Sequence, residues 1–225
     1  MALISVIIPA FNSRKTIANC LASIKNQTLK NFEIIVVNDG STDDTQQIVA
    51  ATSNVTLINQ TNLGAAAARN RGTRAAHGNF LIFCDADIIA RPTLLQTMYD
   101  ALQKNPAASY AYSSFKFGYK TFKLFAFDPA RLERMPYIHT TALIRREHFP
   151  GFDENLKRFQ DWDLWLTMLE QRHTGVFINQ VLFQVASGGT MSQWLPKIAY
   201  QLPFLPRVKT YRQAEAIIKS KHHLA

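Results

Sequence analysis

Cysteine is scarce in this chain, which has only Cys20 and Cys84 among its 225 residues. Both lie in apolar stretches of helix-like or strand-like character, which argues against a disulfide framework and against a metal site built on thiolates. Buried, reduced thiols are typical of a cytoplasmic protein. The sequence therefore predicts a cytoplasmic location.

Long apolar runs are also missing. The first residues, Met1 to Pro9, contain no basic n-region and no small-residue cleavage site, and their apolar run is much shorter than the roughly 20 residues of a membrane span. We therefore expect neither a signal peptide nor a membrane helix there. The segment is interpreted as a first β-strand.

Acidic residues are the third scarce class, since 16 Asp and Glu stand against 25 Lys and Arg and leave a formal net charge of +9. This balance indicates anionic partners, and nucleotides, anionic lipid surfaces and nucleic acid are all compatible with it. The hydrophobic share of 47% is enough for one large core in a chain of this length. We expect one compact unit and not several independent domains.

Short β-branched runs alternate with longer helical patterns up to about Pro92, which is typical of βαβ units around a mostly parallel sheet. We therefore predict an α/β fold whose strands end in loops at one edge, where ligands of such sheets bind. The predicted strands are Leu3–Ile8, Glu33–Val37, Val55–Asn59 and Phe80–Cys84, and the predicted helices are Lys15–Asn26, Asp43–Ala51 and Gly64–His77.

The second half, residues 93–190, has a different composition. Between Tyr110 and Phe127 aromatic residues are interleaved with lysines, which indicates strands plus a loop that carries an interaction surface. The other predicted elements of this half are a helix at Leu94–Lys104, a helix at Asp161–Gln171 and a strand at Gly175–Val185.

Residues 191–225 form a basic tail that is predicted to be helical. It is punctuated by proline and carries six basic residues against one acidic residue. A contact with a membrane surface fits that composition, and so does the solvated face of ordinary closing helices.

An acidic residue ends the second predicted strand. Asp39 follows a buried run at the edge where ligands bind, and its carboxylate there could accept hydrogen bonds from a base or from ribose hydroxyls. Turn chemistry uses the same residue types, with Ser41 or Thr42 as the cap of the next helix. Spacing alone does not decide whether Asp39 belongs to a turn or to a ligand site.

Two more carboxylates end the fourth predicted strand, in the triplet Asp85-Ala86-Asp87. Since both would crowd one cleft, they need a compensating charge, which Mg²⁺ or Mn²⁺ with diphosphate oxygens would provide. Two aspartates at this spacing also occur in solvated loops.

Arg69 and Arg71 lie in a helical pattern whose other residues are small. Small residues let the backbone approach a ligand closely, and a guanidinium is well suited to phosphate. An alanine-rich packing helix with solvated arginines fits the same residues. The pattern leaves both interpretations open.

Asp161 is predicted to lie at the amino end of an amphipathic helix, in which Trp162, Trp165 and Leu166 recur at helical spacing. A carboxylate at that position could be the general base that removes a hydroxyl proton. It could equally cap the helix and compensate its dipole together with Asp163.

Taken in this order, these segments resemble the family 2 glycosyltransferases, whose catalytic domain has the GT-A fold. The resemblance covers roughly residues 3–170. It implies a GT-A catalytic domain over residues 1–190, with a Rossmann-like nucleotide-sugar half at 1–92 and an acceptor half of mixed strands and helix at 93–190. The matching segments are Ser5–Asn12, Val37–Asp43, Asn62–Gly72, Asp85-Ala86-Asp87, Gly151–Glu154 and Gln160-Asp161-Trp162.

The resemblance implies transfer of a sugar, with inversion, from a nucleotide-diphosphate-sugar to an acceptor hydroxyl in polysaccharide or glycolipid assembly. A UDP-sugar is the favoured donor and Mn²⁺ or Mg²⁺ the expected cofactor, with Asp87 as the metal ligand and Asp161 as the base. The expected donor contacts are Pro9, Ala10, Phe11, Asn12, Asp39, Gly64, Arg69, Asp85 and Ala86, and the expected acceptor contacts are His139, Thr140, Gln160 and Trp162.

A glycan or a lipid-linked acceptor is the expected second substrate. The basic tail would then contact the inner face of a membrane as a peripheral attachment, with the rest of the chain in the cytoplasm.

The sequence departs from the family pattern in four places. Asn38 stands where an acidic residue is usual, Ile88 where a further aspartate often follows the triplet, and Gln160 where a glutamate is usual. No histidine occurs in Ser187–Ser192, where many relatives supply another metal or phosphate contact. These departures bear on metal dependence more than on the fold.

Two other functions fit part of the sequence. A metal-dependent nucleotidyltransferase also uses strand-end carboxylates, but Pro9-Ala10-Phe11-Asn12 follows the first strand in place of the glycine-rich loop of that class. A non-enzymatic nucleic-acid or membrane-binding module fits the net charge and the aromatic-lysine stretch. Carboxylates at the strand ends would repel a phosphate polymer, so we expect no nucleic-acid partner.

Overall fold

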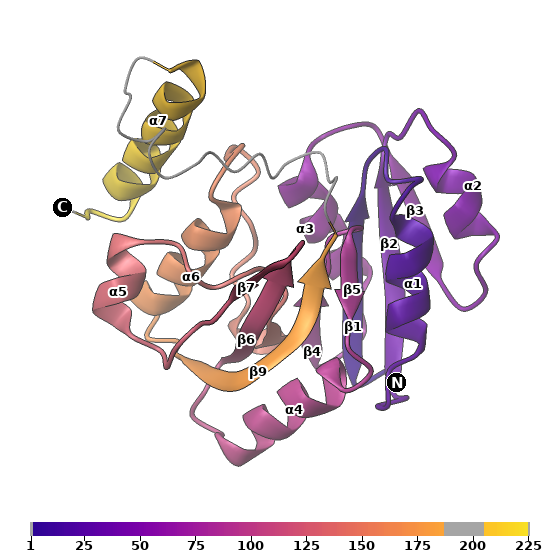
Figure 1. Ribbon diagram of the computed structural model, residues 1–225, viewed down its shortest axis with the longest axis horizontal. Helices are drawn as coiled ribbons and strands as arrows, with labels where there is room; N and C mark the ends of the chain where they lie inside the picture. The colour runs from indigo at the N-terminus through magenta and orange to yellow at the C-terminus, as the bar shows by residue number, and fades with distance from the viewer. Residues whose placement is uncertain (1, 187–204, 225) are drawn as a thin grey trace.

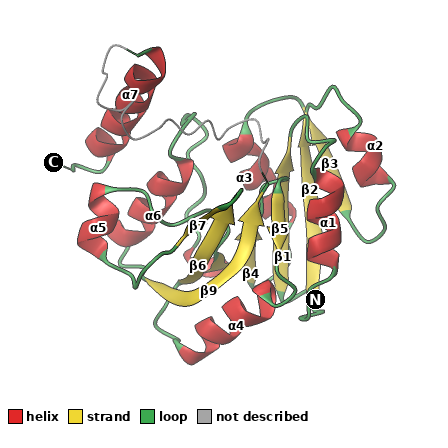
Figure 2. Ribbon diagram, viewed as in Figure 1, coloured by secondary structure: helices red, strands yellow, loops and turns green. Residues whose placement is uncertain are grey.

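The computed structural model describes residues 2–186 and 205–224, and it consists of a central sheet with helices on both faces (Figures 1 and 2). The nine-stranded sheet has the order β3-β2-β1-β4-β8-β6-β9-β5, with β7 paired to β6. The prediction of an α/β fold is confirmed.

The first half of the chain forms the parallel part of this sheet. β1 (Ile4–Ala10) lies between β2 (Phe32–Asp39) and β4 (Phe80–Phe83), and β3 (Thr56–Gln60) lies outside β2. All these pairs are parallel. The predicted strands are correct to within two residues at each end, because their apolar runs are long and bounded by turn residues.

The second half forms the mixed part of the sheet. β6 (Tyr110–Phe117) is parallel to β9 (Gly175–Val185) and antiparallel to β8 (Leu143–Arg145), which continues the sheet from β4. β8 and three other short elements were not predicted individually, because segments of three to six residues are too short to show a period. The other three are β5 (Ile88–Ala90), β7 (Lys120–Phe122) and α5 (Pro129–Arg134).

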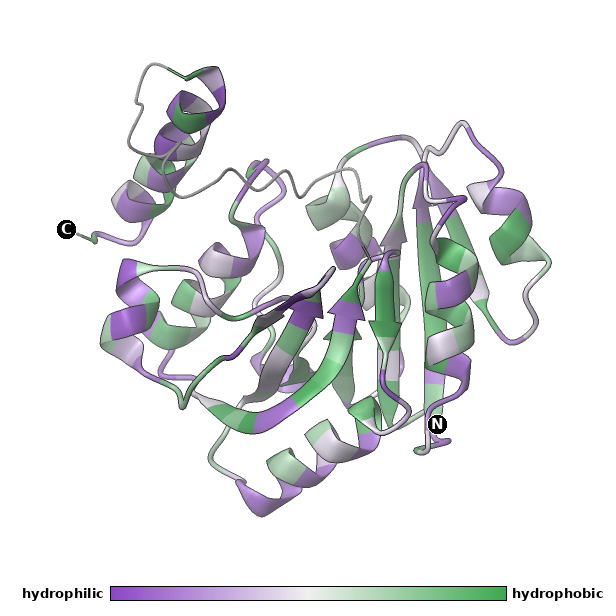
Figure 3. Ribbon diagram, viewed as in Figure 1, coloured by the Kyte–Doolittle hydropathy of each residue, from purple (hydrophilic) through white to green (hydrophobic). Residues whose placement is uncertain are grey.

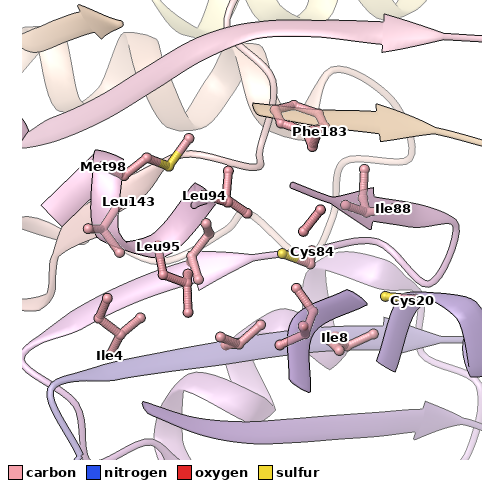
Figure 4. Close-up of a cluster of buried hydrophobic side chains, with 14 of the residues drawn as sticks. Ile4, Ile8, Cys20, Cys84, Ile88, Leu94, Leu95, Met98, Leu143 and Phe183 are labelled. Carbon is pink, nitrogen blue, oxygen red and sulfur yellow. The ribbon is translucent and has the colours of Figure 1, made fainter. Parts of the chain in front are cut away.

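Helices cover the two faces of the sheet with separate apolar clusters. The first cluster joins the sheet to α1 (Ile17–Lys25), α2 (Thr45–Ala50) and α4 (Leu94–Lys104). The second joins it to α3 (Ala65–Ala75), α5 and α6 (Gln160–Glu170). Part of the first cluster, with both cysteines, is shown in Figure 4.

Both cysteines are buried and free, as the sequence predicted. Burial is the main cause that raises the pKa of each thiol, and the nearby Asp85 carboxylate adds to it. Neither thiol is therefore activated as a nucleophile.

The small residues of α3 pack that helix closely against the sheet. A Cβ atom at Gly72 would lie 2.5 Å from Cγ2 of Ile7 on β1, and Ala66 and Ala68 are buried. The packing interpretation of the alanines is therefore correct. The interpretation of the arginines as solvated is correct for Arg71, which is exposed, and wrong for Arg69, which is 4% exposed.

The described part of the basic tail contains α7 (Pro206–Lys221), in which polar and apolar residues alternate around the helix (Figure 3). Val208 and Ile218 are its fully buried residues. The segment Ser187–Ser192, for which no histidine contact was expected, lies outside the described residues. Among the described helices, none has both the length and the apolar composition that crossing a bilayer requires.

Candidate active site

The carboxyl ends of three neighbouring strands meet at one edge of the sheet. The register pairs Ala10 at the end of β1 with Asn38 in β2, and β4 lies on the other side of β1. Asp39 ends β2, and the triplet Asp85-Ala86-Asp87 follows β4. The predicted donor residues of the first half therefore lie at one edge, as the rule for open α/β sheets requires.

Asp39 is buried and anchors the loop before α3. Its Oδ1 accepts hydrogen bonds from the Leu63 amide at 2.8 Å and from the Gln60 side chain at 2.7 Å. Its Oδ2 accepts from the amide of Gly64 at 2.9 Å. A carboxylate offers about four lone-pair sites, so these three bonds leave it with little further capacity.

The loop after β1 is fixed to the loop after β2. Asn12 has a positive φ of 48° and donates its amide to Oγ of Ser41, while its side chain accepts from the amide of Thr42. Neither Ser41 nor Thr42 caps α2. The cap predicted there is wrong, because the helix begins later, after Asp44, and the carboxylate that accepts from its first amide, that of Thr45, is Asp43.

Replacing Asp39 by asparagine is expected to destabilise the fold by about 1 to 3 kcal/mol, because the amide nitrogen that replaces one carboxylate oxygen cannot accept from the backbone N–H group of Leu63 or Gly64 that it would face. Urea unfolding followed by circular dichroism measures this. The matched control is Asp44→Asn at an exposed position, which should stay within about 0.5 kcal/mol of the parent. Equal stability of the two variants would contradict the anchoring role of Asp39.

Arg69 connects the two halves of the site. Its Nη2 lies 2.6 Å from Oδ1 of Asp85, and its Nη1 donates to Oε1 of Gln160 at 2.9 Å. The guanidinium lies over the ring of Phe152 at 5.2 Å, and its buried Nε has no partner among the described residues. A buried arginine with an unpartnered N–H is an arrangement that an anionic ligand can complete.

The two aspartates of the triplet are in different electrostatic states. Burial opposes the charge of Asp85, but Arg69 and then His139 hold its pKa below the ordinary value. Burial and the neighbouring Asp85 charge raise the pKa of Asp87 to about 6. Asp87 therefore lacks the compensating cation that Asp85 has in Arg69.

His139 and Asp161, from the second half of the chain, interact electrostatically with each other and with Arg69. Burial lowers the pKa of His139, against the opposing charges of Asp85 and Asp161. The Thr141 amide donates to Nδ1 of His139 at 3.0 Å, which favours a neutral ring with its proton on Nε2. Burial likewise raises the pKa of Asp161, with His139 as the largest opposing influence.

The residues predicted to contact an acceptor differ in exposure. His139 is partly exposed and packs against the rings of Phe115 and Phe183, while Thr140 is 6% exposed. Trp162 is 1% exposed, and its indole donates to the carbonyl of Leu132 at 2.6 Å. Trp162 therefore belongs to the core, and no indole surface is available for the contact predicted there.

The acidic residues of the site fit a divalent metal only together with a substrate. The described residues contain no group of three His, Cys, Asp or Glu side chains that could surround an ion. Asp87 still provides an uncompensated carboxylate, and Mg²⁺ and Mn²⁺ are commonly held by one or two carboxylates plus phosphate oxygens. The donor set therefore fits a metal that a diphosphate helps to bind.

Residues 5–160 match the family model described as glycosyl transferase family 2. Because the match covers more than half of the chain, the chain belongs to this family. The family resemblance noted from its motifs is thereby confirmed.

The chain is similar to Glycosyltransferase GlyG of Streptococcus pneumoniae serotype 4, with 37% identity over 110 residues that cover 47% of the chain and 36% of that protein. It is also similar in structure to S. aureus TarS 1-349 in complex with UDP-GlcNAc, with a TM-score of 0.73 and 21% identity over 89% of the chain and 64% of that chain.

A third similar structure is glucosyl-3-phosphoglycerate synthase from Mycobacterium tuberculosis with Mn²⁺, UDP-glucose and phosphoglyceric acid. Its TM-score is 0.67, with 18% identity over all of this chain and 81% of that chain. These two structural similarities show the fold, which is GT-A. The chain spans less than two thirds of the length of GlyG and of the TarS chain.

Proposed function

We propose that the chain transfers a sugar from a nucleotide-diphosphate-sugar to an acceptor hydroxyl with inversion at the anomeric carbon. The observation that carries this proposal is the bridge formed by Arg69, which joins Asp85 on the strand-end side to Gln160, the residue before Asp161. A donor site and a base on opposite sides of one cleft are what an in-line displacement needs.

The donor side consists of the strand-end loops. Pro9 to Asn12 and the loop held by Asp39 would enclose the nucleoside, with Phe11, which is 39% exposed, available to contact the base. Since three of the acceptor sites of Asp39 are already used, its principal contribution is to shape the pocket at Gly64. The orphan N–H of Arg69 and the paired Asp85 would meet the sugar and phosphate end.

Asp87 would hold the divalent metal, Mn²⁺ or Mg²⁺, together with the diphosphate. When bound, such an ion supplies Lewis-acid stabilisation of the charge that develops on the leaving diphosphate. Support comes from the uncompensated charge of Asp87 and from the Mn²⁺ and UDP-glucose named with the mycobacterial synthase structure. A UDP-sugar is the donor we propose, which the UDP-GlcNAc complex of TarS also favours.

Asp161 would act as the general base. Its carboxylate accepts the proton of the acceptor hydroxyl while the hydroxyl oxygen forms a bond to the anomeric carbon, and the bond from that carbon to the diphosphate oxygen breaks. His139 would hold its Nε2 proton as a hydrogen-bond donor toward an oxygen of the substrate. The partial burial of Asp161 raises its pKa and so makes it a stronger base than an exposed carboxylate.

A glycan or lipid-linked acceptor at the cytoplasmic face of a membrane remains our proposal for the second substrate. α7 carries three exposed basic residues, Arg207, Lys209 and Arg212, which suit an electrostatic contact with anionic lipid. Its buried apolar residues face the protein, so such a contact would not involve insertion of an apolar helix face. Membership of the glycosyltransferase family argues against the nucleotidyltransferase and the non-enzymatic binding module.

A thermal-shift screen of nucleotide-sugars with and without Mn²⁺ tests the donor site. At a concentration near one hundred times the Kd, binding contributes about 2.7 kcal/mol, which in a chain of this size raises Tm by roughly 5 to 10 °C. We expect this shift for UDP-sugars in the presence of Mn²⁺ and a smaller one for sugar-free nucleosides. The same screen with Arg69→Met should lose most of the shift. No shift with any nucleotide-sugar would contradict the proposed function.

A further inference from the structure

The carboxyl-terminal helix makes polar and aromatic contacts with the helix that carries Asp161. We propose that α7 positions the amino end of α6, with Lys221 and His222 acting as positioning residues through Asp163. This inference rests on the proposed function, because its catalytic consequence depends on Asp161 being the base.

Asp163 is a buried carboxylate in the first turn of α6, two residues after Asp161, and it is only 3% exposed. Its Oδ1 lies 2.7 Å from Nζ of Lys221 and 2.8 Å from Nε2 of His222. A buried carboxylate without such partners would be an uncompensated charge, so α6 in this position depends on α7.

His222 contacts two carboxylates that lie two turns apart on α6. Its Nε2 contacts Asp163 and its Nδ1 lies 2.7 Å from Oε1 of Glu170, seven residues further along the same helix face. Both ring nitrogens of His222 therefore lie within hydrogen-bonding distance of a carboxylate of α6. The side chain of His222 is 2% exposed, so this contact is enclosed by the protein.

Lys221 joins α6 to the loop that packs under Arg69. Its Nζ lies 2.7 Å from Oδ2 of Asp153 as well as from Asp163. Partial burial opposes the charge, but these hydrogen bonds raise the pKa of Lys221, and the bond from Lys221 is the main cause that lowers the pKa of Asp153. The neighbouring Phe152 is fixed by two hydrogen bonds to the side chain of Asn70 on α3.

Tyr211 of α7 supports the backbone just before the site. Phe159 has a φ of +57°, a left-handed conformation that bulky side chains rarely adopt, and it immediately precedes Gln160 and Asp161. Its ring packs edge-on against Tyr211, with centroids 5.0 Å apart, and against Trp162. The strained residue therefore has an aromatic neighbour from α7 on one side and the core on the other.

Together these contacts link α7 to the surroundings of Arg69 by two routes. One passes through Asp153 and Phe152 to the guanidinium, and the other through Asp163 and Phe159 to Gln160. Loss of the α7 contacts would loosen the turn that carries Asp161, whereas Arg69 keeps its ion pair with Asp85 and the neighbouring Phe152 keeps its two hydrogen bonds to Asn70. We therefore expect kcat to fall while the Kd for the donor stays close to that of the parent.

The test compares the double variant Lys221→Met/His222→Leu with Gln213→Leu, a change at an exposed residue of the same helix, in the full chain. We expect the double variant to lose about tenfold to a hundredfold in kcat, while KM and Kd for the UDP-sugar change less than about twofold, because a displacement of about 1 Å is enough for such a loss. Gln213→Leu should keep the parent kcat. Lys221→Arg should retain most of the activity, since it keeps the positive charge that pairs with Asp153 and Asp163.

Amide hydrogen exchange provides a readout that does not depend on turnover. Residues 161–164 should exchange faster in the double variant, while β1 and β2 keep the protection of the parent. Unchanged exchange at 161–164, or a parent-like kcat in the double variant, would overturn the proposal. If the parent binds and turns over no nucleotide-sugar, the proposed function fails, and the exchange result alone then decides whether α7 holds α6.

Discussion

Replacing Asp161 by asparagine is expected to lower kcat by about a hundredfold to ten-thousandfold and to leave donor binding close to that of the parent protein. An asparagine has nearly the same shape but cannot take up the acceptor proton. The donor residues lie on β1, β2, β4 and α3 and do not depend on this charge. Transfer of radiolabelled sugar to acceptor measures kcat, and calorimetry with the UDP-sugar measures Kd.

The matched control for this variant is Asp100→Asn, which makes the same change at a partly exposed aspartate of α4. It should lose much less activity than Asp161→Asn if the chemistry depends on position 161. The parent should also lose kcat as the pH falls through the pKa of Asp161, which burial raises above the ordinary carboxyl value. Turnover retained by Asp161→Asn, with the parent pH profile, would remove Asp161 from the role of base.

Replacing Asp87 by alanine is expected to weaken Mn²⁺-dependent donor binding by about a hundredfold, because losing a direct ligand should cost at least as much as losing an outer contact to a metal ligand. In the absence of metal, Asp87→Ala should leave the Kd for the donor unchanged or lower it, since Asp87 then only repels the diphosphate. Calorimetric titration of the UDP-sugar with and without Mn²⁺ measures both Kd values for each protein.

Asp44→Asn serves again as the control, because it removes one exposed negative charge from the same half of the chain. It should leave the Mn²⁺ dependence of Kd unchanged. The assignment of Asp87 as metal ligand would be abandoned if Asp87→Ala showed the parent's Mn²⁺ dependence. A loss of binding that is equal with and without metal would also count against it, since that pattern indicates damage to the pocket.

Most of the sheet could be predicted from the sequence because its parallel strands are long apolar runs with turn residues at both ends. β5 and β8 could not, since three residues carry no period and their pairing partners lie far along the chain. Helix boundaries near the site were also predicted correctly to within two residues, including the start of α6 at Gln160.

The site residues could be named from motifs, but their partners could not. Nothing in the alanine-rich pattern around Arg69 shows that this arginine is buried while Arg71 is exposed, because that depends on which helix face packs on the sheet. Asp163 looked like a helix-dipole residue from its position alone. Its partners Lys221 and His222 lie about 59 residues further along the chain, beyond the reach of any local rule.

The close approach at Gly72 has a consequence for the charge pair at the centre of the site. Because the Ile7 methyl leaves no room for a side chain there, the separation of α3 from β1 is set by direct contact of the Gly72 backbone with the Ile7 side chain. Arg69 lies one turn earlier on the same helix, and Asp85 follows the strand next to β1. The positions of α3 and β1 thus determine how far the guanidinium reaches. A larger residue at position 72 would move α3 away from the sheet and lengthen the Arg69–Asp85 contact.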